Sequence, residues 1–524
     1  MSAAVTPKPG EVGRRPVAVK RASSGFARTS RGALAAFGRI PRAGRACFAI
    51  AFVNAAIWGV VVPPFQVPDE IAHFAYAQYL AETGKLPPQG SGAQYSPQEQ
   101  TALNGLNFYS VIGRQQMRGI FTSQEDRQLR SLLAAHPSPV GEGGSDPVTN
   151  QPPLYYALEA IPYWLSPSHD ILARLAFMRL LSALMAAGTV LAVFMFLREL
   201  IPRARWAWTI GALVVAFQPT FNFIAAGVQG DNLLFLASAL TFWMLMRTYR
   251  RGLTMRRAVA LGAIIAAGTL AKLTFIALLP GIAVALLLLA WRALPAGRAR
   301  ALRMLATSVA VAAAPVALYG LLNVLVWHRG GPTAGGIAGA TNSALPGGGT
   351  VTLHQTLDYT WELFLPRLWF MHHAYFPGET PLWNTWLNGS IGHFGWLDYS
   401  FPPWVYTDGR YLLYALAALA VLGLVWVRAR VRQVLPIFMS FGVMALGLLG
   451  AIGYAGIRYR LSTGYPFEQA RYLFPLLPLY ALFVVLAARG VGRRWAPLLG
   501  AGLVLLAMVH GLFGETLTIS RYYG

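Results

Sequence analysis

The feature that most constrains this chain is a series of apolar stretches, most of them about 20 residues long, separated by connections that carry its charges. A helix needs about 20 apolar residues to cross a bilayer, and only helices and closed barrels can do so. The pattern predicts an all-α, polytopic membrane protein with about eleven transmembrane helices. The expected spans are 46–63, 171–197, 207–226, 232–247, 257–271, 274–291, 304–326, 411–427, 434–454, 472–488 and 496–513.

Composition agrees with this fold class. Apolar residues make up 55% of the chain and charged residues only 12%. A net charge of +23 would indicate nucleic-acid binding in a soluble protein. Here the basic residues lie between apolar spans, and no spaced basic and aromatic face is present, so we expect membrane lipids as partners and no nucleic acid. The single cysteine, Cys47, excludes an intramolecular disulfide framework.

Arginine at alternate connections sets the expected orientation, because cytoplasmic loops carry an excess of Lys and Arg. The N-terminus is then cytoplasmic and the C-terminus extracytoplasmic. Of the acids, only Glu11 and Glu199 fall on the cytoplasmic side of this map, which indicates function on the outer face. The alternate basic connections contain Arg198, Arg203 and Arg205; Arg247, Arg250, Arg251, Arg256 and Arg257; Arg292, Arg298, Arg300 and Arg303; Arg428, Arg430 and Arg432; and Arg489, Arg493 and Arg494.

The stretch from Pro152 to Leu165 is the one ambiguous segment. Counting it as a span would place residues 166–170 in the cytoplasm without a basic residue and would reverse every later connection. We therefore expect a helix that lies at the outer interface, a depth that suits its tyrosines and Trp164.

Three regions follow from this map. Residues 1–45 are basic and lack an apolar period, so they are expected to form a disordered cytoplasmic tail. Residues 46–513 form the transmembrane domain, which includes two large extracytoplasmic loops with short helices, 64–170 and 327–410. Residues 514–524 form a short extracytoplasmic tail.

A carboxylate pair, Asp69 and Glu70, directly follows the first span. Pro68 is expected to start a short helix here. On that helix Asp69, His73 and Tyr76 share one face. An acid in the first turn also favours the helix dipole, but that effect explains neither the histidine nor the tyrosine. The group is suited to proton transfer at the membrane surface, and we take Asp69, Glu70 and His73 as candidate catalytic residues.

The carboxylate pair after the first span resembles the GT-C superfamily of membrane glycosyltransferases that use lipid-phosphate-linked sugars. A set of motifs is also similar to one bacterial branch that is catalogued as a membrane protein family of unknown function. Members of that branch commonly have histidine where Gln151 stands. The motifs are residues 68–74 (PDEIAHF), 151–156 (QPPLYY), 271–274 (AKLT), 394–398 (FGWLD) and 469–475 (QARYLFP).

The resemblance implies an inverting sugar transfer from a polyprenyl-phosphate donor, with weak or no dependence on a divalent metal. A first-loop carboxylate would accept the proton of the acceptor hydroxyl, and polyprenyl phosphate would leave. The acceptor would be a cell-envelope polysaccharide or a glycolipid. The location would be the bacterial cytoplasmic membrane, with the active site on the extracytoplasmic side.

Basic residues on the outer face are the candidates for binding the donor phosphate. Lys272 lies in a very short hairpin between two spans, where an ionisable residue is a functional candidate by default, although snorkelling to lipid headgroups is the simpler reading. Arg471 opens the tenth span on the outer side, and Arg458 shares its loop. Arginine can bind phosphate with two parallel hydrogen bonds, so Arg471 is the first choice.

Further outer-face residues are expected to contact substrate. The adjacent pair His372–His373 lacks further ligands at the spacing of a zinc site, so no metal site is expected. Asp231 also suits ordinary turn and helix-capping chemistry after Gly230. The candidate substrate contacts are Tyr76, Tyr155, Tyr156, Asp231, His373, Trp396 and Asp398.

Two other classes of function stay open at this point. A transporter or flippase of lipid-linked glycans should place ionisable residues in the middle of the membrane, often in paired halves. In this sequence they cluster at the outer surface. A polysaccharide polymerase of the cell envelope would share the long outer loops.

The orientation can be tested by labelling. A tag after Gly524 and a tag within the 327–410 loop should both react with a membrane-impermeant reagent on intact cells. A C-terminal tag that reacts only after the cells are opened would mean that Pro152 to Leu165 crosses the membrane.

Overall fold

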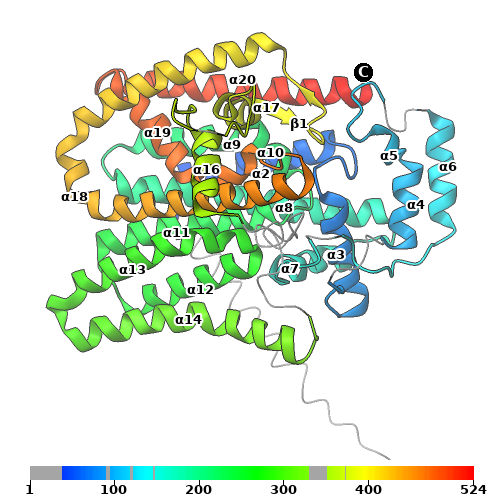
Figure 1. The fold of residues 1–524 in the computed structure, drawn as a ribbon, viewed down its shortest axis with the longest axis horizontal. Helices are drawn as coiled ribbons and strands as arrows, with labels where there is room; N and C mark the ends of the chain where they lie inside the picture. Colours follow the sequence, from blue (N-terminus) through cyan, green and yellow to red (C-terminus); the bar gives the residue numbers. More distant parts are fainter. Residues whose placement is uncertain (1–37, 90–94, 118–121, 146–147, 330–350, 372) are drawn as a thin grey trace, which may run out of the picture.

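The computed structural model describes residues 38–89, 95–117, 122–145, 148–329, 351–371 and 373–524. Most of the expected basic tail, residues 1–37, lies outside the described residues. In Figure 1 the long helices run side by side, and the short helices α3 to α7 gather at one end of them, where the chain also ends. This places the first outer loop and the C-terminus at the same end of the bundle.

Helices account for nearly all of the described secondary structure. The first half contains α2 (Arg42–Val61), α3 (Glu70–Thr83), α4 (Pro97–Gly105), α5 (Phe108–Val111), α6 (Ser123–Ala134), α7 (Leu154–Leu165), α8 (Ile171–Leu200), α9 (Arg205–Ala216), α10 (Pro219–Ala225), α11 (Asp231–Arg251) and α12 (Met255–Ala271). The second half contains η1 (Leu273–Leu278), α13 (Leu279–Ala293), η2 (Leu294–Ala296), α14 (Arg298–Leu325), α16 (Leu353–Phe364), η4 (Leu382–Leu387), α17 (Asn388–Gly392), α18 (Pro403–Thr463), η5 (Ala470–Leu476), α19 (Leu477–Gly490) and α20 (Ala496–Tyr523).

The all-α membrane fold is confirmed. Among the described residues, 8 helical segments are long and apolar enough to cross a bilayer, and α18 supplies two of them, Pro403–Ala429 and Val431–Thr463. The pair α9 and α10, bent by 62°, makes a ninth if it is one span. Helices α11 and α12 occupy the other two expected positions and pack against each other. The number of eleven crossings stays a prediction.

Helix α7 corresponds to the ambiguous segment. Its 12 residues extend about 18 Å, well short of the roughly 30 Å of a bilayer core. It packs against α3 and α8, burying Tyr155 and Tyr156, and exposes Trp164 and Leu165. The length of α7 excludes a crossing by this helix alone.

Both ends of the described chain differ from the expected boundaries. Helix α2 begins at Arg42, inside the expected tail 1–45. Helix α20 continues to Tyr523, so residues 514–523 are helical and do not form a separate tail. The last turn is held by Arg521, which donates to the carbonyl oxygen of Arg114 at 2.7 Å and to Asp398 at 3.0 Å.

The described part of the second outer loop contains a short hairpin. Strands β1 (His393–Phe394) and β2 (Tyr399–Ser400) are antiparallel, with Phe394 opposite Tyr399. The turn needs positive φ at Gly395 and Leu397, at 62° and 64°. A carboxylate oxygen of Asp398 accepts the Trp396 amide at 2.9 Å and so stabilises the turn.

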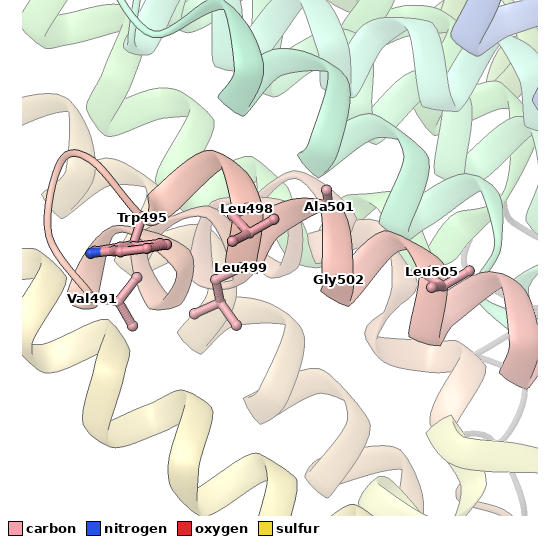
Figure 2. A pocket seen from close by; sticks show the side chains of 7 residues that line it. All are labelled: Val491, Trp495, Leu498, Leu499, Ala501, Gly502 and Leu505. Carbon is pink, nitrogen blue, oxygen red and sulfur yellow. The ribbon is translucent and has the colours of Figure 1, made fainter.

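Two apolar hollows open along α20. One has a volume of about 730 Å³ and is shown in Figure 2. It is lined by Val491, Trp495, Leu498, Leu499, Ala501, Gly502 and Leu505. The other is a groove of about 800 Å³ between α9, the first part of α18, η5, α19 and α20. Its lining includes Leu413, Leu473, Phe474, Leu477, Tyr480 and Phe513.

A buried ion pair joins the first outer loop to the bundle. Arg179 of α8 donates to both carboxylate oxygens of Glu70, at 2.8 and 2.6 Å. The same guanidinium donates to the carbonyl oxygens of Val62 and Pro63 at the end of α2, at 2.7 and 2.9 Å. The amide of Val228 adds a third hydrogen bond to Glu70, at 2.9 Å. This pair therefore fixes the start of α3 against α2, α8 and the turn before α11.

Neutralising Glu70 should destabilise the protein strongly. Glu70→Gln leaves the Arg179 guanidinium buried without a counter-ion, and breaking a buried pair in this way costs about 3 to 5 kcal/mol. Chemical denaturation in detergent measures the loss. Asp126→Asn is the matched control, because the Asp126–Arg130 pair is exposed, with side-chain exposures of 50% and 77%, and its loss should leave stability nearly unchanged. Equal stability of Glu70→Gln and the parent protein would contradict the assigned role.

Candidate active site

Asp69 has an unusual backbone conformation. Its φ of 64° and ψ of 0° lie in the left-handed region, directly before the first residue of α3. This conformation costs a non-glycine residue of the order of 1 kcal/mol. The side chain makes no capping hydrogen bond to the helix and is 42% exposed. The carboxylate of Asp69 is therefore turned away from α3 rather than used to cap it.

The two carboxylates of the pair have different surroundings. Glu70 is fully buried and bound to Arg179, whereas Asp69 is partly exposed and bound to Arg471. Of the two carboxylates, the accessible one is that of Asp69. The sequence alone treats the two acids as equivalent, because they are adjacent.

Four charged side chains form a chain of ion pairs, which we call the charged quartet: Asp69, Arg471, Asp231 and Lys272. Nη2 of Arg471 donates to Asp69 at 2.6 Å, and its Nε lies 3.8 Å from a carboxylate oxygen of Asp231. Nζ of Lys272 donates to Asp231 at 2.7 Å. The quartet brings together the start of α3, η5, the start of α11 and the break between α12 and η1.

Electrostatics keep Asp69 ionised. Burial raises the pKa of this carboxyl, but the positive charge and hydrogen bond of Arg471, together with Lys272, outweigh burial, so the pKa lies below its ordinary value. The formal charges of the quartet sum to zero. An ionised carboxylate is able to accept a proton at neutral pH.

Several polar atoms of the quartet have no hydrogen-bond partner among the described residues. They are Nε and Nη1 of Arg471 and Oδ2 of Asp231, and all three are buried. A buried donor without an acceptor is costly, and in a native structure it indicates a ligand, an ion or water. The geometry of the guanidinium suits phosphate oxygens.

An aromatic wall lies beside the quartet. Nδ1 of His73 is 2.9 Å from the hydroxyl of Tyr156, and the rings of Tyr76 and Tyr156 are stacked with centroids 3.6 Å apart. The Tyr155 ring meets His73 edge-on at 6.3 Å. Burial, reinforced by nearby Lys272, lowers the pKa of His73 to about 3. His73 is therefore neutral at physiological pH and serves as a hydrogen-bonding group rather than as an acid.

The structure places other candidate residues elsewhere. Arg458 lies over the ring of Tyr454 on α18. His373 is exposed, and Trp396 packs edge-on against Phe108. Asp398 is paired with Arg521 and belongs to the hairpin described above. Among the printed contacts of the described residues, none joins these four side chains to the quartet.

Two residues that hold the site were not singled out from the sequence. Arg179 binds Glu70, and its position within an apolar span could have marked it, since such residues are functional candidates. Gln151 accepts the backbone amide of Leu273, next to Lys272, at 3.3 Å, and its carbonyl oxygen accepts the Tyr76 hydroxyl at 3.2 Å. Gln151 therefore has a positioning contact at the break before η1.

Within the described part of the chain, no group of three or more His, Cys, Asp or Glu side chains is arranged to hold a metal ion. The quartet contains two carboxylates, but each is already paired with a cation.

The family model described as predicted membrane protein (DUF2142) matches residues 52–480. The chain belongs to this family. The match confirms the resemblance to a catalogued membrane protein family that the motifs indicated. All four members of the quartet lie within the matched residues. A comparison with curated proteins finds no match.

Several solved structures are similar to the chain at low identity. The oligosaccharyltransferase AglB from Archaeoglobus fulgidus, solved with an inhibitory peptide and a dolichol-phosphate, is 14% identical with a TM-score of 0.44. The alignment covers 92% of this chain and 56% of AglB, so the chain spans little more than half of that protein. ArnT from Cupriavidus metallidurans, bound to undecaprenyl phosphate, is 12% identical with a TM-score of 0.40, over 90% of this chain and 76% of ArnT. The arabinosyltransferase EmbB from Mycobacterium smegmatis is 14% identical with a TM-score of 0.38, over 92% of this chain and 42% of EmbB.

Proposed function

We propose that this protein is a polyprenyl-phosphate-sugar-dependent glycosyltransferase that acts on the extracytoplasmic face of the bacterial cytoplasmic membrane. It would transfer a sugar to a cell-envelope polysaccharide or glycolipid. One observation carries the proposal: a partly exposed, ionised carboxylate, Asp69, lies 2.6 Å from an arginine whose other guanidinium donors are unpaired. A general base beside an oxyanion-binding group is the arrangement that glycosyl transfer from a phosphate donor needs.

In the proposed reaction, Asp69 accepts the proton of the acceptor hydroxyl. The hydroxyl oxygen attacks the anomeric carbon as the bond from that carbon to the phosphate oxygen breaks. The bonding pair leaves with the polyprenyl phosphate, whose charge becomes more negative. Arg471 would bind the phosphate oxygens and stabilise this charge, and Lys272 would hold Asp231 in place beside Arg471.

The Asp69–Arg471 pair implies that the donor binds before Asp69 becomes an effective base. While Arg471 is bound to Asp69, the pKa of the carboxyl is low, so Asp69 is a weak base. A donor phosphate competes for the same guanidinium. Drawing positive charge away from Asp69 raises its pKa, so the base would become stronger once the donor is bound.

The remaining candidates have supporting roles in this proposal. Glu70 would position Asp69 by fixing the start of α3 rather than take part in proton transfer. His73, Tyr155 and Tyr156 would form one wall of the sugar site. The mechanism as written contains no step that requires a metal ion; the resemblance to GT-C enzymes implies weak or no metal dependence.

The apolar groove of about 800 Å³ would hold the polyprenyl chain of the donor. Leu473 and Phe474 line this groove, and they follow Arg471 closely on η5. A lipid bound there would have its apolar chain in the groove and its phosphate near Arg471. Apolar burial of the chain would supply affinity that is independent of the sugar.

The base is tested by Asp69→Asn, which keeps the size of the side chain and removes the proton acceptor. Sugar transfer should fall by about 10²-fold or more, the usual scale for loss of a general base, while donor binding persists. In the parent protein the lowered pKa of Asp69 predicts that kcat/KM is maintained as the pH falls to about 4, the ordinary aspartate value, before it declines.

Glu70→Gln is the comparison variant, assayed at a temperature at which it is folded. Its rate per folded molecule should fall less than that of Asp69→Asn. Near-parent turnover by Asp69→Asn with an inactive, folded Glu70→Gln would make Glu70 the base. Activity in both variants would favour a flippase or transporter.

Arg471 is tested by two substitutions. Arg471→Ala should raise KM for the donor, because the phosphate loses its charged donors, and should move the acid limb of the pH profile upward, because Asp69 loses the charge that lowers its pKa. Arg471→Lys should restore the charge but only part of the affinity, since a bidentate contact is lost. Parent-like kinetics in both variants with subsaturating donor would remove Arg471 from the site.

A further inference from the structure

One buried arginine differs from the others in the described part of the chain. Five arginines there are less than 9% exposed, and four of them are within ion-pair distance of a carboxylate. The fifth, Arg329, is 8% exposed and makes no ion pair with any described residue. The four paired arginines are Arg174, Arg179, Arg471 and Arg521.

The contacts of Arg329 leave most of its hydrogen-bonding capacity unused. Nη2 donates to the backbone carbonyl oxygen of Thr149. Nε and Nη1 are buried and have no hydrogen-bond partner among the described residues. The backbone is held by a hydrogen bond from the Arg329 amide to the carbonyl oxygen of Asn323 at 2.9 Å, near the end of α14. The side chain is thus held in place without a counter-ion from the described part of the chain.

A buried, unpaired guanidinium needs an explanation. Removing a charge from water costs several kcal/mol, and proteins normally offset this cost with a paired charge and hydrogen bonds. The Thr149 carbonyl oxygen and the Tyr76 hydroxyl supply acceptors, and the five N–H donors of a guanidinium can use more. An anionic group on a substrate would supply both the counter-charge and the missing acceptors.

The position of Arg329 connects it to the quartet through the aromatic wall. The hydroxyl of Tyr76 lies beside its guanidinium. Tyr76 is stacked on Tyr156, and Tyr156 contacts His73, which lies close enough to Asp69 and Asp231 for their charges to act on its pKa. Arg329 is therefore linked to the surroundings of the charged quartet through Tyr76, Tyr156 and His73.

The net charge of the site also suits a substrate with a second anionic group. The quartet is formally neutral, and Arg329 is not paired with an acid among the described residues, so within that part of the chain Arg329 adds one unbalanced positive charge. A phosphodiester donor carries one negative charge, and the phosphate that leaves gains more during transfer. A substrate with a second anionic group would meet a cation in each of two places, Arg471 and Arg329.

We propose that Arg329 forms a second oxyanion subsite, which binds an anionic group of a substrate apart from the phosphate held by Arg471. This inference rests on the proposed function and narrows its substrate class to acidic substrates. The shared chemistry is a group with two or more anionic oxygens. Its source is either a second phosphate on the lipid donor or a carboxylate or phosphate on the acceptor.

The test uses the full-length protein in nanodiscs and four probes: farnesyl phosphate, farnesyl diphosphate, inorganic phosphate and glucuronate. Dissociation constants are measured for the parent protein, Arg329→Gln and Arg329→Lys. The two small anions are titrated into protein saturated with farnesyl phosphate. Arg300→Gln is the matched control, because it removes one positive charge from an exposed position on α14 and should bind every probe as the parent does.

If the second anionic group is a phosphate of the lipid donor, the parent protein should bind farnesyl diphosphate more tightly than farnesyl phosphate. Arg329→Gln should then lose about tenfold or more of its affinity for the diphosphate. If the second anionic group belongs to the acceptor, the parent protein should bind phosphate or glucuronate. Arg329→Gln should then lose affinity for that small anion by a similar factor. Parent-like affinity of Arg329→Gln for all four probes would overturn the proposal.

Two further measurements distinguish failure of the Arg329 subsite from misfolding of a variant and from failure of the proposed donor. If Arg329→Gln does not fold, Arg329→Lys is used instead, because it keeps the positive charge and removes the planar guanidinium. Its affinity for the probe that the parent binds should fall several-fold. Unchanged affinity of Arg329→Lys would overturn the subsite. A parent protein that binds neither farnesyl probe contradicts the proposed donor. In that case, the subsite is still supported if the parent binds phosphate or glucuronate and Arg329→Gln does not. If the parent binds neither small anion, the subsite is overturned.

Discussion

The buried ion pair between Glu70 and Arg179 is the contact on which the arrangement of the site depends. It is bidentate, fully removed from water and supported by carbonyl oxygens at the end of α2 and by the amide of Val228. A pair of this kind is expensive to break because one unpaired charge stays buried. It holds the start of α3 in one place, and so it sets where Asp69 can reach.

The charged quartet is also held by ion pairs, but some of its hydrogen-bonding atoms have no partner among the described residues. Asp69, Arg471, Asp231 and Lys272 alternate in sign, so each charge has a neighbour of opposite sign, yet Arg471 keeps two unpaired donors. A fully satisfied ion pair stabilises a structure, whereas a neutral cluster with spare donors can exchange partners with a ligand. This difference separates the supporting role of Glu70 from the proposed catalytic role of Asp69.

Arg329 extends this reasoning to a residue that the sequence motifs did not mark. It precedes a glycine-rich stretch and has no acidic neighbour within 25 residues on either side. Its isolation becomes visible only when the other buried arginines are compared with it in space. Arg471 belongs to the charged quartet, whereas Arg329 lies beside Tyr76 of the Tyr76–Tyr156 stack, and each guanidinium has two buried nitrogens without a hydrogen-bond partner among the described residues.

Sequence alone predicts the helical membrane fold, because length and apolarity are local properties that decide whether a segment can cross a bilayer. It also selected Asp69, Arg471, Lys272 and Asp231, since charged residues beside apolar spans are costly unless they are used. Tertiary structure decided which of two adjacent acids is exposed and joined Asp69 to Arg471, 402 residues away. It also placed Asp398 with Arg521 rather than in the quartet. Pairing between distant side chains depends on how the helices pack, and periodicity within each helix carries no information about its partner.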